Sequence, residues 1–299
     1  MKLDGITTFV AVAEGGSLSE AARRLRVSRS VVSDRLAELE RELGTILLRR
    51  TTRKLSLTED GAAFLTRAAN IVREIEQATA DLAERRGTLS GPLRISAPVT
   101  FGRMHLGPAI YRFLAAHPAI QLTLDLNDRR VDAAADGYDA VIRHGVIEDS
   151  YLVAWKLAPS RRVLVASANY LAQHGTPTSA ESLAQHRGIF YTNRGVADWR
   201  FVHQGQSTIV RGTLALGLNN GDMIREAAIA GLGIALLPSF VVGAAIKAGE
   251  LQVIEIGMAP EQEFIYVAHP DRQHPSAKLR ALSDHLRDTF GSPPYWDAP

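Results

Sequence analysis

The sequence contains no cysteine among its 299 residues. This absence excludes disulfide bonds, thiolate nucleophiles and cysteine-ligated metals, and it fits the reducing cytosol. Long hydrophobic runs are missing too, since no stretch reaches the ~18 uninterrupted apolar residues of a membrane-spanning helix. The first apolar segment is interrupted by Asp4 and Glu14, so it does not have the pattern of a signal peptide. We therefore expect a cytoplasmic protein that does not cross a membrane.

Motifs of catalysis are also missing. The nine histidines are scattered without the H-E-x-x-H spacing of a zinc site. Neither a G-x-S-x-G nucleophile motif nor a phosphate-binding G-x-x-x-x-G-K-[ST] motif occurs, and the "GLG" at 231–233 is a turn signal. The sequence thus predicts no enzyme, no catalytic residue, no metal site and no cofactor.

The composition, by contrast, is that of a folded globular protein. Apolar residues make up 46% and charged residues 22%, enough for a sizeable core, and the length suggests about two domains. Formal net charge is only +2, so the distribution of charge is more informative than the total. Between Gly44 and Thr58 all four charged residues are basic: Arg49, Arg50, Arg53 and Lys54.

The first 44 residues predict three helices. Apolar residues at helical spacing indicate a helix over residues 4–14, which Gly15 and Gly16 end. Ser17 is an N-cap candidate for a second helix that ends near residue 25, and Glu20 completes a capping box. After a short break at residues 26–27, Ser28 can cap a third helix that fades near Gly44.

A small hairpin and a long helix follow. "ILLRRTTRKLSLT" predicts two short strands around a basic tip. Thr58 can cap a helix that runs to about residue 86. One face of this helix carries apolar residues at alternating spacings of four and three, typical of a coiled coil. We interpret this face as a dimerisation seam, the alternative being packing on the helix's own domain; its residues are Phe64, Ala68, Ile71, Ile75, Ala78 and Leu82.

"RRGTLSGP" at residues 85–92 marks a domain boundary, because glycines, a serine and a proline separate two periodic regions. Beyond it, strand-like segments such as "LRISA" and "IQLTLDLN" alternate with helical ones. This alternation predicts an α/β domain with a largely parallel sheet. We expect the tail "GSPPYWDAP" to be loose.

The three N-terminal helices could read DNA. In a helix-turn-helix, the second helix of the motif enters the major groove while the first crosses the backbone. Here the third helix would read bases, and an Arg29 guanidinium could contact guanine with two hydrogen bonds. The remaining cations would contact phosphates, with the hairpin tip near the minor groove. The predicted DNA-binding residues are Arg23, Arg26, Ser28, Arg29, Ser30, Ser33, Arg35, Arg50, Arg53 and Lys54. The alternative is a three-helix packing unit with a solvated basic face.

The chain resembles the LysR-type transcriptional regulators over nearly its whole length. "AARRL", "VS" repeated at 27–28 and 32–33, and "LTEDG" resemble that family's N-terminal winged helix-turn-helix. "LRISAPVTFGRMHLGPAIYRFLAAHP" and "NNGDMIREAAIAGLGIALLPSF" resemble its effector-binding domain. The sequence departs from the family where Arg29-Ser30-Val31 replaces a frequent Gln-Pro-Ala, and at Asp34, which would repel phosphates unless Arg29 or Arg35 pairs with it.

The resemblance implies a domain plan. Residues 1–58 would be the winged helix-turn-helix and residues 59–88 the linker and dimerisation helix. Residues 91–299 would form a periplasmic-binding-protein-like α/β domain of two lobes, about 91–162 with 267–299, and about 163–266. The chain would cross between lobes near residues 160–165 and return near residues 264–269. Implied partners are double-stranded DNA, a second copy of the chain (a homodimer, and a homotetramer as the family usually forms), a small-molecule effector and RNA polymerase.

The effector is expected in the cleft between the lobes, where strand ends meet helix starts. The candidate residues are Pro98, Val99, Thr100, Phe101, Arg143, His144, Asn219, Asn220 and Asp222. Alternatives stand beside them: Thr100 and residues 219–222 could only cap helices, and Arg143 could belong to a structural ion pair rather than bind an anionic effector. Trp199 and Phe201 could line the cleft or belong to the core.

Two other classes of protein fit the sequence less well than a regulator. A solute-binding protein, or an enzyme on a binding fold, would predict an export signal or a catalytic constellation. A protein–protein adaptor with a helical head leaves the acid-free basic hairpin unexplained.

Overall fold

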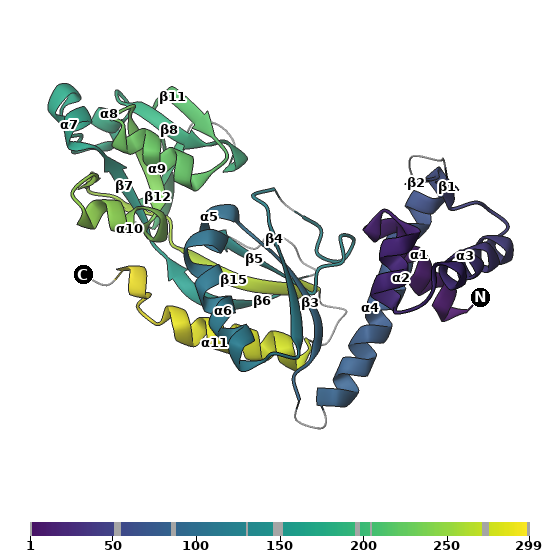
Figure 1. Cartoon of the computed structure of the whole chain (residues 1–299). Coiled ribbons are helices and arrows are strands. Elements are labelled where there is room, and N and C mark those ends of the chain that lie inside the picture. Colours follow the sequence, from purple (N-terminus) through teal and green to yellow (C-terminus); the bar gives the residue numbers. More distant parts are fainter. Residues whose placement is uncertain are drawn as a thin grey trace. The chain divides into compact units, whose positions relative to one another are not determined.

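The computed structural model describes residues 2–50, 55–84, 88–129, 131–145, 152–194, 198–203, 205–270 and 275–297. The chain divides into two compact units, residues 1–92 with 134–137, and residues 93–133 with 138–299 (Figure 1). We describe each unit by itself. No described helix is long and apolar enough to span a membrane.

The N-terminal unit has the predicted order of elements. It consists of α1 (Leu3–Gly15), α2 (Leu18–Leu25), α3 (Arg29–Leu43), β1 (Leu48–Arg50), β2 (Leu55–Leu57) and α4 (Glu59–Glu84), with β1 and β2 antiparallel. The predicted caps are confirmed: the Ser17 side chain accepts the N–H of Glu20, and that of Ser28 accepts the N–H of Val31. Glu20 does not complete a capping box, since its carboxylate pairs with Arg23 instead.

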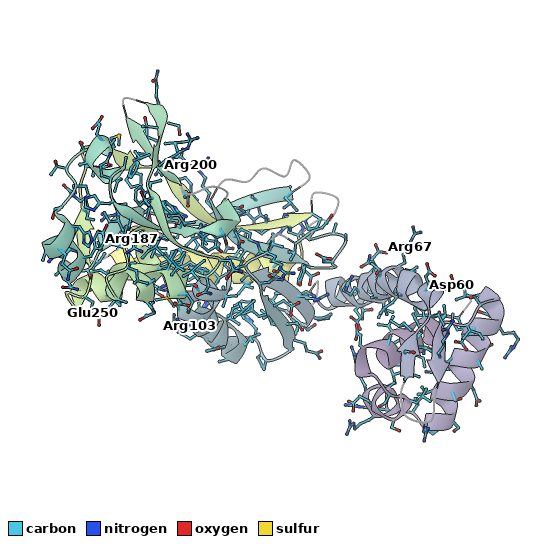
Figure 2. All side chains as sticks on the ribbon, turned by 90° about the horizontal axis from the view of Figure 1, so that it is seen from above. Asp60, Arg67, Arg103, Arg187, Arg200 and Glu250 are labelled. Carbon is cyan, nitrogen blue, oxygen red and sulfur yellow. The ribbon has the colours of Figure 1, made fainter. Side chains whose placement is uncertain are left out.

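The hairpin is joined to α3 and α4 by specific contacts. The Glu40 carboxylate accepts the N–H groups of Leu47 and Leu48 at 2.8 and 3.1 Å. Thr58 caps α4 by accepting the N–H of Gly61 at 2.9 Å, as the sequence predicts. The contacts of Glu40 and Thr58 fix the direction in which the two strands leave the helices. Asp60 and Arg67, both on α4, are labelled in Figure 2.

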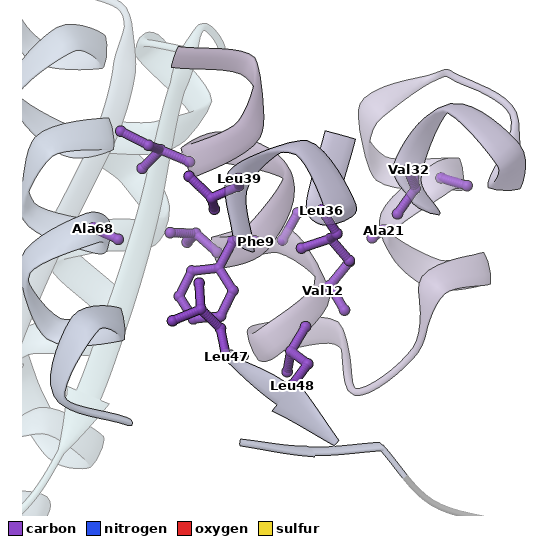
Figure 3. Packing of buried hydrophobic residues seen from close by; sticks show 13 residues of the cluster. Phe9, Val12, Ala21, Val32, Leu36, Leu39, Leu47, Leu48 and Ala68 are labelled. Atoms are coloured by element: carbon purple, nitrogen blue, oxygen red, sulfur yellow. The ribbon is translucent and has the colours of Figure 1, made fainter. Parts of the chain in front are cut away.

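The core of this unit reaches into the predicted dimerisation seam. Phe9, Leu36 and Leu39 are buried at its centre (Figure 3). Ala68 is fully buried in the same cluster, and the Phe64 ring lies 5.5 Å from that of Phe9. The assignment of Ala68 and Phe64 to an intermolecular seam is therefore wrong, because the first turns of α4 cover the core of their own unit.

The C-terminal unit contains two five-stranded sheets. The order of the first is β4-β3-β5-β15-β6, from Ile120–Leu126, Gly91–Ala97, Ala140–Gly145, Glu263–Pro270 and Leu152–Ser160. The order of the second is β11-β8-β12-β7-β13, from Thr213–Leu218, Arg187–Tyr191, Ile234–Pro238, Arg162–Ala166 and Gln252–Ile254. A smaller sheet has the order β10-β9-β14, from Gln206–Arg211, Asp198–His203 and Ala259–Pro260.

Both large sheets are mixed, so the expectation of a largely parallel sheet is only half right. β3 is parallel to β5, and β8 is parallel to both β11 and β12. β15 is antiparallel to β5 and β6, and β7 is antiparallel to β12 and β13. The antiparallel pairs arise where the chain passes between the sheets, because β6 leads directly into β7 and β15 returns beside β6.

These two crossings define two lobes. The first crossing is at Arg161, between β6 and β7, within the predicted range. The return lies between Pro260, which ends β14 in the second lobe, and Glu263, before the predicted residues 264–269, which instead lie inside β15. The predicted return is misplaced because "EFIYVAHP" is one uninterrupted strand that belongs entirely to the first lobe.

The helices divide between the lobes. The first lobe carries one helical stretch, α5 (Val99–Phe101), the π-helix η1 (Gly102–Leu106) and α6 (Gly107–Ala116), together with α11 (Ala277–Phe290). α6 and α11 lie side by side along this lobe (Figure 1). The second lobe carries α7 (Ala168–His174), α8 (Ala180–Leu183), the short helix η2 (Thr192–Arg194), α9 (Gly221–Ile229) and α10 (Ser239–Lys247).

The C-terminal tail is not loose. It forms the short helix η3 (Tyr295–Asp297), and Trp296 is only 8% exposed. The Trp296 ring contacts Phe101 and Phe290 of the first lobe and Phe240 of the second. The tail thus joins an aromatic cluster that bridges the lobes.

Candidate DNA-binding surface and effector pocket

The start of α3 is capped and exposed. Arg26 has a left-handed φ of 55°, which turns the chain between α2 and α3. Its backbone N–H donates to the carbonyls of Ala22 and Arg23 in α2. Ser28, Arg29 and Ser30 are all exposed, and the Ser28 and Ser30 hydroxyls lie 2.7 Å apart. The opposite face of α3 is held in the core by its buried apolar residues. A helix anchored in this way can present its first turn to another molecule.

The cations around α3 fall into two groups. Within the described part of the chain, Arg26 and Arg29 form no side-chain hydrogen bond or ion pair. Arg23 is paired with Glu20, and Arg35 donates to Asp4 at 2.7 Å. Arg26 and Arg29 are therefore available to a DNA partner at once, whereas Arg23 and Arg35 would have to exchange a carboxylate for a phosphate.

Asp34 does not form the suggested ion pair with Arg35. Arg35 pairs with Asp4 and not with Asp34, and the Asp34 side chain is exposed. An exposed carboxylate repels phosphate, so Asp34 would oppose a close approach of this side of α3 to a duplex.

Arg49 is exposed in the middle of β1, between Leu48, which contacts Glu40, and the tip of the hairpin. The backbone of Arg50 ends β1, but the structure does not describe its side chain, and Arg53 and Lys54 lie outside the described residues. The role of these three cations in DNA binding stays a prediction.

The remaining part of the predicted seam is exposed. Ile71 is 37%, Ile75 40% and Leu82 60% exposed, and Ala78 is exposed as well. These four residues follow one another at seam spacing along α4, beyond the turns that cover the core. The dimerisation prediction therefore narrows to Ile71, Ile75, Ala78 and Leu82.

The predicted effector residues converge in part. Pro98, Thr100, Phe101 and His144 line one pocket, and Gly221 of the second lobe faces Thr100 across it. The cavity between them is about 40 Å³. This is close to the volume of one or two water molecules.

Most of the other predicted residues have structural roles. The N–H of Val99 donates to the Asp128 carboxylate at 2.9 Å. Asn220 caps α9 by accepting the N–H of Met223, and Asn219 is exposed to solvent. Asp222 does reach the cleft, but its partner there is Thr100 of the other lobe, at 3.2 Å.

Arg143 does not line this pocket. It donates to the Ser96 hydroxyl at 2.9 Å and to the carbonyl of Ile142 at 2.7 Å. Burial lowers the pKa of Arg143, and the surrounding tyrosines and Asp128 offset part of this effect. Trp199 and Phe201 are each 1% exposed in the core of the second lobe, and neither lines this pocket. Phe201 instead lines a separate cavity of about 900 Å³ beside the two crossings.

Among the pocket residues with polar side chains, sequence reasoning missed three, Asp128, Arg162 and Tyr191. Asp128 follows closely on β4, the same strand-end signal that pointed to Pro98, and could have been found. Arg162 is buried and donates to the Glu263 carboxylate at 3.0 Å, and the His144 ring lies 3.5 Å from the same carboxylate. The Arg162–Glu263 pair joins the two crossings between the lobes, and only the fold brings residues so distant in sequence together.

Comparison with known proteins settles the family. The model described as "Bacterial regulatory helix-turn-helix protein, lysR family" matches residues 3–62, and the model described as "LysR substrate binding domain" matches residues 86–291. The chain belongs to the LysR family. It is thus a DNA-binding transcriptional regulator with an effector-binding domain, which confirms the resemblance of the sequence motifs.

Relatives of this LysR-type regulator match over nearly their full length. The regulator CrgA of Neisseria meningitidis serogroup C is 33% identical, and the match covers 96% of both chains. The regulator PtxR of Pseudomonas aeruginosa is 32% identical over 99% of this chain and 95% of its own. The solved structure of Neisseria CrgA superimposes with a TM-score of 0.60 at 30% identity, covering 96% of this chain and 98% of that one. The full-length Vibrio cholerae virulence activator AphB gives a TM-score of 0.59 at 27% identity, with 96% and 98% covered.

Proposed function

We propose that this LysR-type regulator reads DNA with the first turn of α3 and changes its grip on DNA when a small molecule binds between the lobes. The observation that carries the reading step is Arg29, exposed and unpaired among the described residues, on a helix whose other face is locked in the core. To recognise a base, a side chain must extend from a well-positioned backbone and carry unused hydrogen-bond donors. Arg29 meets both conditions, because the backbone of α3 is held by its buried face and the Arg29 guanidinium has no partner among the described residues. Arg26, Arg49 and the hairpin tip would supply contacts to phosphates.

We infer that two chains form a dimer through the apolar seam of α4. Ile71, Ile75, Ala78 and Leu82 would pair with the same residues of a second chain and place two reading helices on one duplex. We further propose a homotetramer formed through the C-terminal units, RNA polymerase as a partner and the cytoplasm as the location. The relatives are transcriptional regulators, which supports a role other than catalysis.

Control by the effector requires two arrangements of the lobes or subunits that bind it with different affinity. The two crossings at Arg161 and at residues 261–262 are the points about which the lobes could move. Motion there would change the spacing or bend of the DNA held by the N-terminal units.

Sequencing of genomic fragments bound by the intact protein tests this function. A recurring site with two half-sites about one helical turn, or a multiple of it, apart is the expected result. Even recovery of all fragments would contradict sequence-specific binding. The genes beside the recovered sites would also indicate the class of effector.

A further inference from the structure

The largest cavity described above lies beside the two crossings and not in the pocket between the lobes. It measures about 900 Å³, and both Arg161 of the first crossing and Gln262 of the second line it. Pro159 of the first lobe and Val163 of the second belong to its walls, and Pro293 of the C-terminal tail closes another side. We call this space the hinge cavity.

The hinge cavity has the volume of a ligand site. Sites for small organic molecules usually measure about 300–1,000 Å³. The pocket between the lobes, by contrast, measures about 40 Å³, and Arg162 is the one described residue that lines both spaces. The hinge cavity is therefore a separate site, and it is large enough to hold a molecule of two fused rings.

The floor of the hinge cavity is apolar. Leu164, Phe201 and Ile256 line it and belong to the buried core of the second lobe. Val253 of β13 also lines it, and this side chain is 41% exposed. A ring placed on this floor would remove exposed apolar surface from water, which favours binding.

The charges around the hinge cavity are mainly negative. Three carboxylates line it without a cationic partner among the described residues, those of Glu255, Glu261 and Asp297. Glu261 accepts the hydroxyl of Ser207 at 2.7 Å, which leaves its charge uncompensated. Arg161 also lines the cavity, and its side chain is exposed. Because the three carboxylates outnumber this guanidinium, the cavity favours a cation over an anion.

The remaining charged pair of the hinge cavity does not change this balance. Nε of Arg162 donates to the Glu263 carboxylate at 3.0 Å, and both residues are buried. Nη1 of Arg162 donates to the carbonyl of Leu236 at 3.0 Å. An anionic ligand that took Arg162 from Glu263 would leave a buried carboxylate uncompensated, which costs more than a new ion pair returns.

The C-terminal tail connects the hinge cavity to both lobes. Pro293 and Asp297 line the cavity, and Trp296 contacts Phe101 of the first lobe and Phe240 of the second. A molecule in the cavity thus lies against both crossings and against a tail that is packed on both lobes. Such a molecule would resist any change in their relative positions.

We propose that the hinge cavity binds a small apolar molecule with a protonated amine, whose rings lie on the apolar floor and whose amine faces the carboxylates. This site differs in place from the effector pocket between the lobes. The bound amine holds the crossings and the tail in one arrangement and thereby changes the affinity of the protein for DNA. This last consequence rests on the proposed control of DNA binding by movement of the lobes.

Three probes that share a ring system and differ in charge test the class of ligand. Naphthylmethylamine is cationic, naphthylmethanol is neutral and naphthoate is anionic, and calorimetric titration of the full chain gives the affinity of each. The amine should bind several-fold more tightly than the alcohol, and naphthoate should bind most weakly. No binding of the amine, equal affinities, or tighter binding of naphthoate would overturn the proposal.

Hydrogen–deuterium exchange locates the bound amine without any substitution. At saturating naphthylmethylamine, residues 253–263 should exchange more slowly, because they form one wall of the hinge cavity. Residues 100–101 line the pocket between the lobes instead. Unchanged exchange at residues 253–263, with or without protection of residues 100–101, would place the amine elsewhere and overturn the proposal.

A double variant tests the role of the carboxylates. Glu255→Gln combined with Asp297→Asn removes two charges and keeps the size of both side chains. The affinity for naphthylmethylamine should fall several-fold, while the affinity for naphthylmethanol stays the same. The matched control is Glu250→Gln, because Glu250 is an exposed carboxylate of the same lobe that does not line the cavity (Figure 2). Equal amine affinity in the wild type, the double variant and the control would contradict the proposed recognition of the amine.

The effect on DNA is measured separately. The affinity of the full chain for a bound fragment is compared with and without naphthylmethylamine, and a several-fold change that the double variant lacks is expected. An amine that binds in the hinge cavity and leaves the DNA affinity unchanged would refute the proposed effect on the lobes. Absence of sequence-specific DNA binding without the amine would instead refute the proposed function, so the two failures are distinguishable.

Discussion

At the scale of single residues, Gly61 must be glycine because its backbone lies against the backbone of Leu47. Any side chain at this position would begin at a Cβ that overlaps the carbonyl of Leu47, where the chain enters the hairpin. The same carbonyl accepts the N–H of Thr58, so it cannot easily move away. The glycine of "LTEDG" is required by this approach of two backbones.

We predict that Gly61→Ala lowers the stability of the N-terminal unit by about 1–3 kcal/mol, the usual range for overpacking a close contact. Thermal unfolding of the intact protein measures the effect, with Ala62→Ser on the neighbouring exposed position as control. An unchanged midpoint for Gly61→Ala would mean that the hairpin shifts without cost.

His105 makes the C-terminal unit sensitive to acid. Its ring lies 2.6 Å from the Tyr295 hydroxyl and 3.0 Å from the carbonyl of Phe240, inside the aromatic cluster. Burial lowers the pKa of His105, and the hydrogen bond to Phe240 offsets part of this shift. Below the unfolded-state pKa of about 6.5, the unfolded chain therefore binds a proton that the folded chain resists.

Stability should consequently be fully present above about pH 6.5 and fall as the pH drops toward the lowered pKa of the folded state. Unfolding midpoints between about pH 7.5 and about pH 5.5 test this sign. His105→Gln should flatten the decline, whereas His117→Gln, at the end of α6, should leave it in place. A decline of equal slope in all three proteins would assign the acid sensitivity to other groups.

At the scale of elements, α4 serves two purposes along its length. Its first turns cover the core through Phe64 and Ala68, and its later turns expose Ile71, Ile75 and Leu82. The apolar spacing is continuous across both parts. Periodicity alone therefore predicts the helix and its apolar face but does not tell which turns face the protein's own core.

We predict that Ile71→Asp combined with Ile75→Asp abolishes the α4 contact and leaves only dimers held through the C-terminal units, because two charges on each chain would face one another in the seam. Sedimentation velocity of the double variant, beside Glu74→Gln on the same helix, measures the change. Unchanged oligomers that still unfold normally would place the dimer contact elsewhere.

The sequence predicted these elements correctly where the cause is local. Ser17, Ser28 and Thr58 cap the helices that follow them because a cap needs only the next three residues. The prediction of a loose tail was wrong because the ring partners of Trp296 in the first and second lobes lie far away in the sequence. The contact of Asp222 with Thr100 was hidden for the same reason.

At the scale of the whole molecule, the net charge of +2 gives little attraction to DNA at a distance. Binding must then depend on the local cations of α3 and the hairpin. Each phosphate that they neutralise releases condensed counterions, and the logarithm of the binding constant falls by about 0.9 per phosphate for each unit of log salt.

We therefore predict a DNA affinity that falls linearly with salt on a double-logarithmic plot. Titrations of a bound fragment at several salt concentrations give the slope. Arg49→Ala should make the slope shallower and weaken all sequences alike, as expected of a phosphate contact. An affinity independent of salt would be incompatible with the proposed surface.

The most direct test of the central claim, that α3 reads DNA sequence, is a base-by-base affinity profile of the intact protein and of Arg29→Ala on a recovered site. The account predicts that Arg29→Ala loses about 1–3 kcal/mol of discrimination at one base pair in each half-site and keeps the rest of the profile. A uniform loss on every sequence, with no base preference relaxed, would contradict it and reduce Arg29 to a phosphate contact.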